Sequence, residues 1–281
     1  MPHWLIHSHT HDLSTRGLIM GIVNVTPDSF SDGGQYFDPE RAIEHGLELA
    51  AEGAGILDVG GESTRPGAAP VSEEEELRRV VPVIRALRAQ TQALISIDTF
   101  KATVAEQALA AGADIINDVS GLTHDPRMVE VARASTCGLV VMHMKGEPRT
   151  MQLNPVYADV VAEVAACFEE RVTTLAAAGI DPRRIVLDPG IGFGKNLDHN
   201  LALLRSLPLL RVQGRPLVIG VSRKSMIGKV LGTPGMAART WPTVAVTSYV
   251  REHGAHIVRV HEVKPNADAM RMTEAILFGV V

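Results

Sequence analysis

Short runs of apolar residues recur along the chain, and each run ends at a residue with a polar or chemically active side chain. Eight such runs end at Asn24, Asp58, Asp98, Asn117, Met142-His143, Asp188, Ser222 and Arg259-Val260-His261. Apolar runs of this length without alternation are typical of strands buried on both faces, and a helix-sized segment follows each one. The pattern therefore predicts an α/β fold in which a parallel sheet closes into a (β/α)8 TIM barrel.

The segments between the runs contain signals for helix starts. Proline follows a capping residue at Asp38-Pro39, Asp125-Pro126 and Asn154-Pro155, which predicts three helices that begin at these prolines. Ser72 and Glu75 form a potential capping box, so we interpret the acidic run 73–76 as a first helical turn rather than as a metal site. Two apolar stripes with helical spacing are expected to pack on the barrel, at positions 77, 80, 81, 84 and 87 and at positions 156, 160, 164, 168, 172 and 175.

The length of the chain suits one barrel. The chain has 281 residues, of which 46% are hydrophobic, and (β/α)8 barrels typically need ~250 residues. We therefore expect a single domain over residues 1–281, with residues 1–17 as an extension before the first barrel strand. The alternating His7, His9 and His11 resemble a binuclear metallohydrolase motif, but they precede that strand, so an exposed extended segment is the favoured interpretation.

Charge and composition exclude several classes of partner. The formal net charge is -5, and Lys and Arg do not cluster with aromatic residues, which argues against nucleic acid. No apolar stretch approaches the ~20 residues of a membrane span, and no secretory signal is evident, so we expect no membrane association and a cytoplasmic location. Cys137 and Cys167 have no paired spacing, which indicates buried thiols rather than a disulfide or a metal site.

Two connections are longer and more polar than a turn requires. Residues 24–34 and 60–67 follow the first two runs and are rich in glycine and hydroxyl side chains, which is typical of lids at a barrel mouth. Arg65 lies in the second connection, and an arginine among flexible backbone N–H groups suits a phosphate or pyrophosphate. Lys224, Arg259 and His261 end other runs at the same predicted rim, so the sequence indicates a polyanionic substrate or leaving group.

A second group of residues indicates a different kind of ligand. Asp98, Asn117 and Asp188 end three of the runs, and together with Lys224 they could bind the edge of a fused heterocycle with amide and amino groups. Any one of the acids could instead cap the next helix. The alternating glycines of residues 188–195 lack the spacing of a dinucleotide fingerprint, which excludes nicotinamide binding and favours close approach of a ligand ring to the backbone.

Taken together, these motifs resemble those of the dihydropteroate synthase family. The resemblance extends in order over residues 24–34, 58–67, 97–99, 117–118, 188–195, 222–225 and 259–261. It implies a (β/α)8 barrel that joins 6-hydroxymethyl-7,8-dihydropterin pyrophosphate to p-aminobenzoate and releases pyrophosphate and 7,8-dihydropteroate. It further implies a magnesium cofactor, a homodimer, inhibition by sulfonamides and a dissociative mechanism in which pyrophosphate leaves before the arylamine attacks.

The resemblance also implies a role for individual residues. It assigns the pterin to Asp98, Asn117, Met142, Asp188 and Lys224; pyrophosphate to Asn24, Thr64, Arg65, Arg259 and His261; p-aminobenzoate to Phe30, Thr64, Pro66, Phe193, Ser222 and Lys224; magnesium to Asn24; and catalytic roles to Asp58, Asp98, Asp188 and Lys224. Asp32 would belong to a lid with Phe30. The segment 238–243, with Trp241-Pro242, departs from the family pattern near the expected dimer contact.

Other functions remain open from the residues. A pterin-dependent methyltransferase domain would share the acidic residues and Asn117, but it gives no reason for Arg65 or the other rim cations. A Schiff-base aldolase could use Lys224, because lysines at strand ends do so in barrels. A catalytically silent paralogue that only binds pterins is the remaining alternative.

Overall fold

The computed structural model describes residues 2–26, 39–63, 69–146, 150–232 and 235–280. Eight parallel strands form one sheet in the order β8-β7-β6-β5-β4-β3-β10-β9. They are β3 (Leu18–Asn24), β4 (Ile56–Gly60), β5 (Leu94–Asp98), β6 (Ile115–Asp118), β7 (Gly138–Met142), β8 (Ile185–Asp188), β9 (Val218–Ile219) and β10 (Ile257–Val260). A parallel bridge between Leu187 in β8 and Leu217, directly before β9, joins the two ends of this order and closes the barrel.

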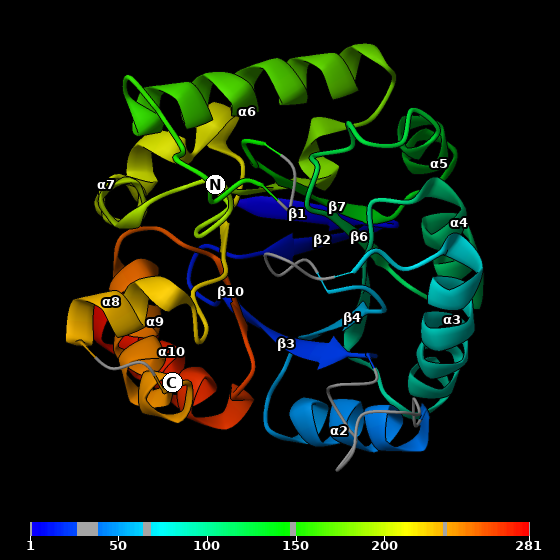
Figure 1. Ribbon diagram of the computed structural model, residues 1–281. Helices are drawn as coiled ribbons and strands as arrows, with labels where there is room; N and C mark the ends of the chain where they lie inside the picture. Colours follow the sequence, from blue (N-terminus) through cyan, green and yellow to red (C-terminus); the bar gives the residue numbers. More distant parts are fainter. Residues whose placement is uncertain (1, 27–38, 64–68, 147–149, 233–234, 281) are drawn as a thin grey trace.

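Helices surround this barrel on its outer side (Figure 1). They are α2 (Pro39–Ala51), α3 (Glu73–Gln90), α4 (Ala102–Ala111), α5 (Met128–Ala134), α6 (Val160–Ala177), α7 (Leu197–Arg205), α8 (Ser225–Leu231), α9 (Thr240–Glu252) and α10 (Val263–Phe278). Every one of the eight predicted runs contributes a barrel strand, and the predicted (β/α)8 fold is confirmed. None of the helices in the described ranges is long and apolar enough to cross a membrane.

The barrel interior is built in layers by the two-residue period of its strands. The layer near the strand starts is apolar and consists of Met20, Ile56, Ile115, Val140, Val186, Val218 and Ile257. Two residues further along the same strands lie Ile22, Asp58, Asn117, Met142, Asp188, Gly220 and Arg259. The residues between these two layers face the helices and form the outer core. One strand period therefore separates an apolar plug from a polar pocket.

An N-terminal hairpin closes the barrel at the strand starts. Strands β1 (His3–Ile6) and β2 (His9–Asp12) pair antiparallel, and Trp4, Ile6 and Leu13 are buried against the apolar layer. The Trp4 indole N–H donates to the Arg184 carbonyl at 2.7 Å. His9 and His11 lie in β2, in agreement with the expected extended segment, whereas His7 lies in the turn before it with a left-handed φ of 53°.

The predicted helix starts were partly wrong. Helix α2 begins at Pro39, and Ser72 caps α3 by accepting from the Glu75 backbone N–H at 3.2 Å, both as expected. Helix α6 begins only at Val160, because Asp159 caps it by accepting from Val161 and Ala162. Asn154 instead has a left-handed φ of 56°.

Two further expectations are wrong. Helix α5 begins at Met128 rather than at Pro126. The Asp125 carboxylate accepts from the Arg127 N–H at 2.9 Å, in the turn before α5, and also from the Ala102 N–H at 2.9 Å, at the start of α4. Val156, predicted to lie on the buried face of α6, precedes the helix and is 66% exposed.

Two further details concern side chains away from the barrel mouth. Glu76, in the first turn of α3, is buried and forms an ion pair with Lys101. Lys101 also binds Glu62 at 2.5 Å. Cys137 is buried and Cys167 is half-buried, and both are free thiols as predicted.

Candidate active site at the barrel mouth

Arg259 organises the carboxylates at the centre of the polar pocket. Its Nε donates to Asp58 Oδ2 at 2.6 Å, and its Nη2 donates to Asp98 Oδ2 at 2.7 Å. Asn117 Nδ2 donates to both oxygens of Asp58, at 3.1 and 3.3 Å. Because an ionised carboxylate only accepts, this contact fixes the amide orientation and turns Asn117 Oδ1 away from Asp58. The pocket therefore presents Asp98 and an amide acceptor above a fully buried Asp58.

Burial changes the proton affinity of the pocket side chains. It raises the pKa of Asp98 to about 7, with Asp58 acting in the same direction and Arg259 in the opposite one. Burial also raises the pKa of Asp188, against the effect of Lys224. The pKa of Lys224 falls to about 8 because its ammonium is buried, although Asp188 opposes the change. Perturbed groups that share one cavity are typical of a functional site.

The connection after β8 wraps around Lys224. The Lys224 ammonium donates to the Ile191 carbonyl and lies 4.7 Å from the centroid of the Phe193 ring. Asp188 begins the same connection and accepts from the Gly190 N–H at 2.7 Å. Asp188, Phe193 and Lys224, which the resemblance assigns to ligand binding, are thus brought together by one short loop.

A second contact joins the ends of β9 and β10. Ser222 Oγ lies 2.8 Å from His261 Nδ1 and accepts from the His261 backbone N–H at 3.2 Å. A hydroxyl can donate one hydrogen bond and accept two, so the direction of the contact with Nδ1 follows the tautomer of the imidazole. Ser222 therefore orients the imidazole of His261 at the rim.

Two other expected site residues, Asn24 and Met142, lie at the ends of barrel strands. Asn24 ends β3 beside Gly60, and Met142 ends β7 on the interior face, whereas His143 follows on the opposite face. Phe30, Asp32, Thr64, Arg65 and Pro66 lie outside the described residues.

The described residues would suit a magnesium ion that has few protein ligands. No group of three or more His, Cys, Asp or Glu side chains that could hold a metal ion occurs among the residues the structure describes. Mg²⁺ commonly keeps several waters and is held by one or two protein oxygens together with substrate phosphates. The carbonyl oxygen of Asn24 at the mouth supplies one such hard oxygen ligand, so these residues suit a metal that arrives with a pyrophosphate.

Lys195 is a charged residue without a predicted role, and it is only 2% exposed. Burial lowers its pKa to about 7, and burial lowers the pKa of its neighbour His143 to about 3, with a further contribution from Lys195. Nothing in the spacing of the chain signals this pair, because the two residues meet only through the packing of two loops.

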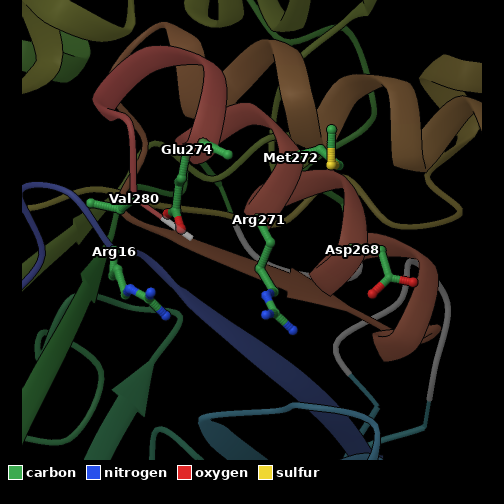
Figure 2. Close-up of a pocket in the computed structure, with 7 residues that line it drawn as sticks. Arg16, Asp268, Arg271, Met272, Glu274 and Val280 are labelled. Atoms are coloured by element: carbon green, nitrogen blue, oxygen red, sulfur yellow. The ribbon is translucent and has the colours of Figure 1, made fainter.

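A different hollow lies near the strand starts. It has a volume of about 250 Å³ and is lined by Arg16, Asp268, Arg271, Met272, Glu274, Ala275 and Val280. Figure 2 shows Arg271, Asp268 and Glu274 on α10, and Arg16 on the segment before β3. None of the predicted site residues lines it.

Comparisons with known proteins identify the family of the chain. The chain matches the family model described as pterin binding enzyme over residues 20–261. It is 51% identical over 261 residues to a dihydropteroate synthase of Neisseria meningitidis serogroup C, covering 92% of each chain. Two solved dihydropteroate synthases superpose with TM-scores of 0.91: that of Xanthomonas albilineans with 4-aminobenzoic acid, 45% identical over 99% of this chain and 98% of the other, and that of Yersinia pestis with a sulfonamide drug complex, 42% identical over 99% and 100%.

The family model spans most of the chain, and among the described residues that resemble the family, Asp58, Asp98, Asn117 and Arg259 are joined by hydrogen bonds at the barrel mouth. The chain therefore belongs to the dihydropteroate synthase family of pterin-binding enzymes.

Proposed function

We propose that the protein condenses 6-hydroxymethyl-7,8-dihydropterin pyrophosphate with p-aminobenzoate to give 7,8-dihydropteroate and pyrophosphate. The observation that supports this most directly is the set of interactions that links the polar side chains at the barrel mouth. Arg259 binds Asp98 and Asp58, Asn117 binds Asp58, and Asp188 interacts electrostatically with Lys224 and Arg259. Asp98, Asn117, Asp188 and Lys224 offer carboxylate acceptors, an amide and an ammonium donor to the edge of a pterin ring. Met142 lies at the interior level of Asn117 and Asp188 and adds an apolar contact.

The proposed pterin contacts follow from the groups already engaged within the pocket. Asp188 accepts ring and amino N–H groups, and Lys224 donates to a ring carbonyl or nitrogen. Asn117 uses Oδ1 as an acceptor, because its Nδ2 is held by Asp58. Asp58 lies below the ring and keeps Arg259 and Asn117 in place.

The proposed mechanism is dissociative. The bond between the pterin methylene carbon and the pyrophosphate oxygen breaks, and its electron pair leaves on pyrophosphate. The resulting methylene cation lies near the carboxylates of Asp98 and Asp188, which stabilise it electrostatically. The amine nitrogen of p-aminobenzoate then attacks with its lone pair and loses a proton, so no protein nucleophile is required.

The leaving group is assigned to the rim. Arg259 and His261 lie on β10 and directly after it, and Asn24 lies on the neighbouring strand β3. Magnesium, when bound through Asn24, would neutralise charge that develops on the departing pyrophosphate. Thr64 and Arg65, outside the described residues, are proposed to join this set.

The p-aminobenzoate subsite is assigned to Phe193, Ser222 and Lys224, with Phe30, Thr64 and Pro66 beyond the described residues. The Phe193 ring offers an apolar face next to a cation, which suits an aromatic carboxylate. Sulfonamides have a similar aryl amine opposite an anionic group, and the Yersinia pestis relative is known in a sulfonamide complex. We expect sulfonamide inhibition that weakens as p-aminobenzoate increases; inhibition independent of p-aminobenzoate would contradict this assignment.

We also propose that the protein is a homodimer. An apolar groove of about 570 Å³ lies between α7, α8 and α9 and includes Leu204, Ile227, Trp241 and Tyr249. Trp241 is 73% exposed at its edge, within the segment that departs from the family pattern. Light scattering should give a dimer mass for the wild type and a monomer mass for Trp241→Glu, whereas Met272→Glu on α10 should remain dimeric.

One assay tests the catalytic proposal. Purified protein is supplied with magnesium, the dihydropterin pyrophosphate and p-aminobenzoate, and 7,8-dihydropteroate is detected by mass. Asp98→Asn and Lys224→Ala should each lose at least about tenfold in pterin affinity by calorimetry, because each removes a charge-assisted contact worth about 1.5 to 3 kcal/mol. Pterin binding without product formation would instead identify a silent paralogue, and trapping of a carbonyl substrate by borohydride would identify an aldolase.

A further inference from the structure

Lys195 has an unusual environment for a charged side chain. Its Nζ lies 3.0 Å from His143 Nδ1, 3.2 Å from the His143 carbonyl and 2.9 Å from the Phe193 carbonyl. None of these three partners is a carboxylate. The ammonium has three N–H donors and thus meets three acceptors. A buried ammonium is costly, and an apolar side chain of similar size would fill the same space at lower cost.

The contact with His143 determines the state of the imidazole. In its protonated form Lys195 only donates, so below its pKa of about 7 the Nδ1 atom of His143 accepts and the neutral ring has its proton on Nε2. Burial and the adjacent Lys195 both lower the pKa of His143, which agrees with a neutral ring.

The loops that contain these residues are in direct backbone contact. A Cβ on Gly190 would lie 2.0 Å from the His143 carbonyl oxygen, and a Cβ on Gly194 would lie 2.1 Å from the Lys145 carbonyl oxygen. Tyr157 Oη adds a hydrogen bond to the Gly194 carbonyl at 2.9 Å. The loop after β8 therefore rests on the loop after β7, and Lys195 joins the two from within.

The same loop supplies groups to the site. Its Phe193 ring and its Ile191 carbonyl both contact the Lys224 ammonium. Because Lys195 holds the carbonyl of Phe193 directly, the direction of that peptide bond depends on the buried ammonium. A shift of this peptide would move the aromatic ring.

We propose that Lys195 is a positioning residue, which acts through His143 and the Phe193 carbonyl to hold the Phe193 ring in the geometry that the p-aminobenzoate subsite requires. The assignment of that subsite rests on the proposed function, whereas the state of His143 does not. Pterin contacts from Asp98 and Asn117 come from other strands and should depend less on Lys195.

Steady-state kinetics test the positioning role. Lys195→Met keeps the length of the side chain and removes all three donors, so we expect the KM for p-aminobenzoate to rise about tenfold or more, while the KM for the dihydropterin pyrophosphate changes by less than about threefold. Leu175→Ala on α6 is the control for general destabilisation, and it should leave both KM values unchanged. Equal changes in the two KM values, or no change, would overturn the proposal.

Variants of His143, which accepts from Lys195, test the same contact if Lys195→Met folds poorly. His143→Leu removes the Nδ1 acceptor and should raise the KM for p-aminobenzoate severalfold. His143→Asn places an amide oxygen near the Nδ1 position and should restore most of the wild-type value. If both variants behave alike, the hydrogen bond to Lys195 does not position the subsite.

A spectroscopic measurement is independent of catalysis. Long-range ¹H–¹⁵N correlation spectra of histidine-labelled protein, assigned with His143→Asn, should show His143 as the neutral Nε2–H tautomer at pH 6, between the pKa of His143 and that of Lys195. A protonated ring or the Nδ1–H tautomer would refute the arrangement. A wild-type protein that forms no dihydropteroate yet shows this tautomer would refute the proposed function and leave the Lys195 geometry standing.

Discussion

Arg259 shows how one side chain can determine the state of several others. Its planar guanidinium reaches Asp58 and Asp98 through two different nitrogens, a geometry that the single ammonium of lysine does not reproduce. Burial opposes the charge of Arg259, but Asp58 and Asp98 outweigh it and raise its pKa. Any pyrophosphate at the rim thus meets an arginine that already has carboxylate partners.

Removal of this arginine should destabilise the protein strongly. Arg259→Leu leaves Asp58 buried without its ion-pair partner, and breaking a buried pair in this way costs about 3 to 5 kcal/mol. Urea unfolding should show the loss, whereas Lys264→Ala on the surface should change the free energy of unfolding by no more than about 0.5 kcal/mol. Similar values for the two variants would mean that Asp58 is tolerated without Arg259.

The pKa of Asp98 predicts a pH dependence of activity. Burial raises this pKa to about 7, so the carboxyl is ionised above pH 7 and protonated below it. If the anion binds the pterin and stabilises the cation, kcat/KM for the dihydropterin pyrophosphate should fall as pH decreases through about 7. Asp98→Asn should abolish that acidic limb at low residual activity, and persistence of the limb in the variant would assign it to another group.

Individual elements reveal which local signals are decisive. The proline signal at 155 was outweighed by another cap, since Asp159 caps α6. Asp125 accepts from the turn before α5 and also from the Ala102 N–H at the start of α4, and no local pattern reveals the second contact. A cap five residues beyond Asn154 therefore decides the start of α6.

The cap of α6 gives a quantitative expectation. Asp159→Ala removes the acceptor for the backbone N–H groups of Val161 and Ala162, and loss of such a cap costs about 1 kcal/mol. The free energy of unfolding in urea should decrease by that amount, and Glu170→Ala on the exposed face of the same helix should have little effect. An unchanged value for Asp159→Ala would show that another group takes over the cap.

The barrel and much of its pocket could be predicted because both follow from strand periodicity. Asp58, Asp98, Asn117 and Asp188 end buried strands, and parallel strands bring such ends together. The partnership of Lys195 with His143 could not be predicted, since it depends on how two glycine-containing loops cross. Local spacing describes elements well and describes contacts between distant loops poorly.

At the scale of the whole molecule, the N-terminal hairpin acts as the floor of the barrel. Trp4 is fully buried beneath the apolar layer, on the side away from the polar pocket. The stability of the barrel and the chemistry of its mouth therefore depend on opposite ends of the same strands.

This separation can be tested with a cavity. Trp4→Ala should reduce the free energy of unfolding by about 3 to 5 kcal/mol, as is typical of a buried tryptophan, while kcat of the folded protein at 25 °C stays within about twofold of the wild type. Leu5→Ala, on the half-exposed face of β1, should cost less. A large loss of kcat at full folding would show that the floor and the mouth are coupled.

The two-residue period of the barrel strands has a consequence for how this chain can diverge. In β8, Val186 and Asp188 face inward and Leu187 faces the helices. Insertion of a single residue between Val186 and Leu187 would turn the carboxylate into the outer apolar core and place leucine at the pterin pocket. A single substitution in these strands changes one side chain, whereas the insertion or deletion of an odd number of residues turns every later side chain of the strand to the opposite face. Insertions and deletions in descendants of this sequence should accordingly accumulate in the connections, and the barrel strands should retain their length.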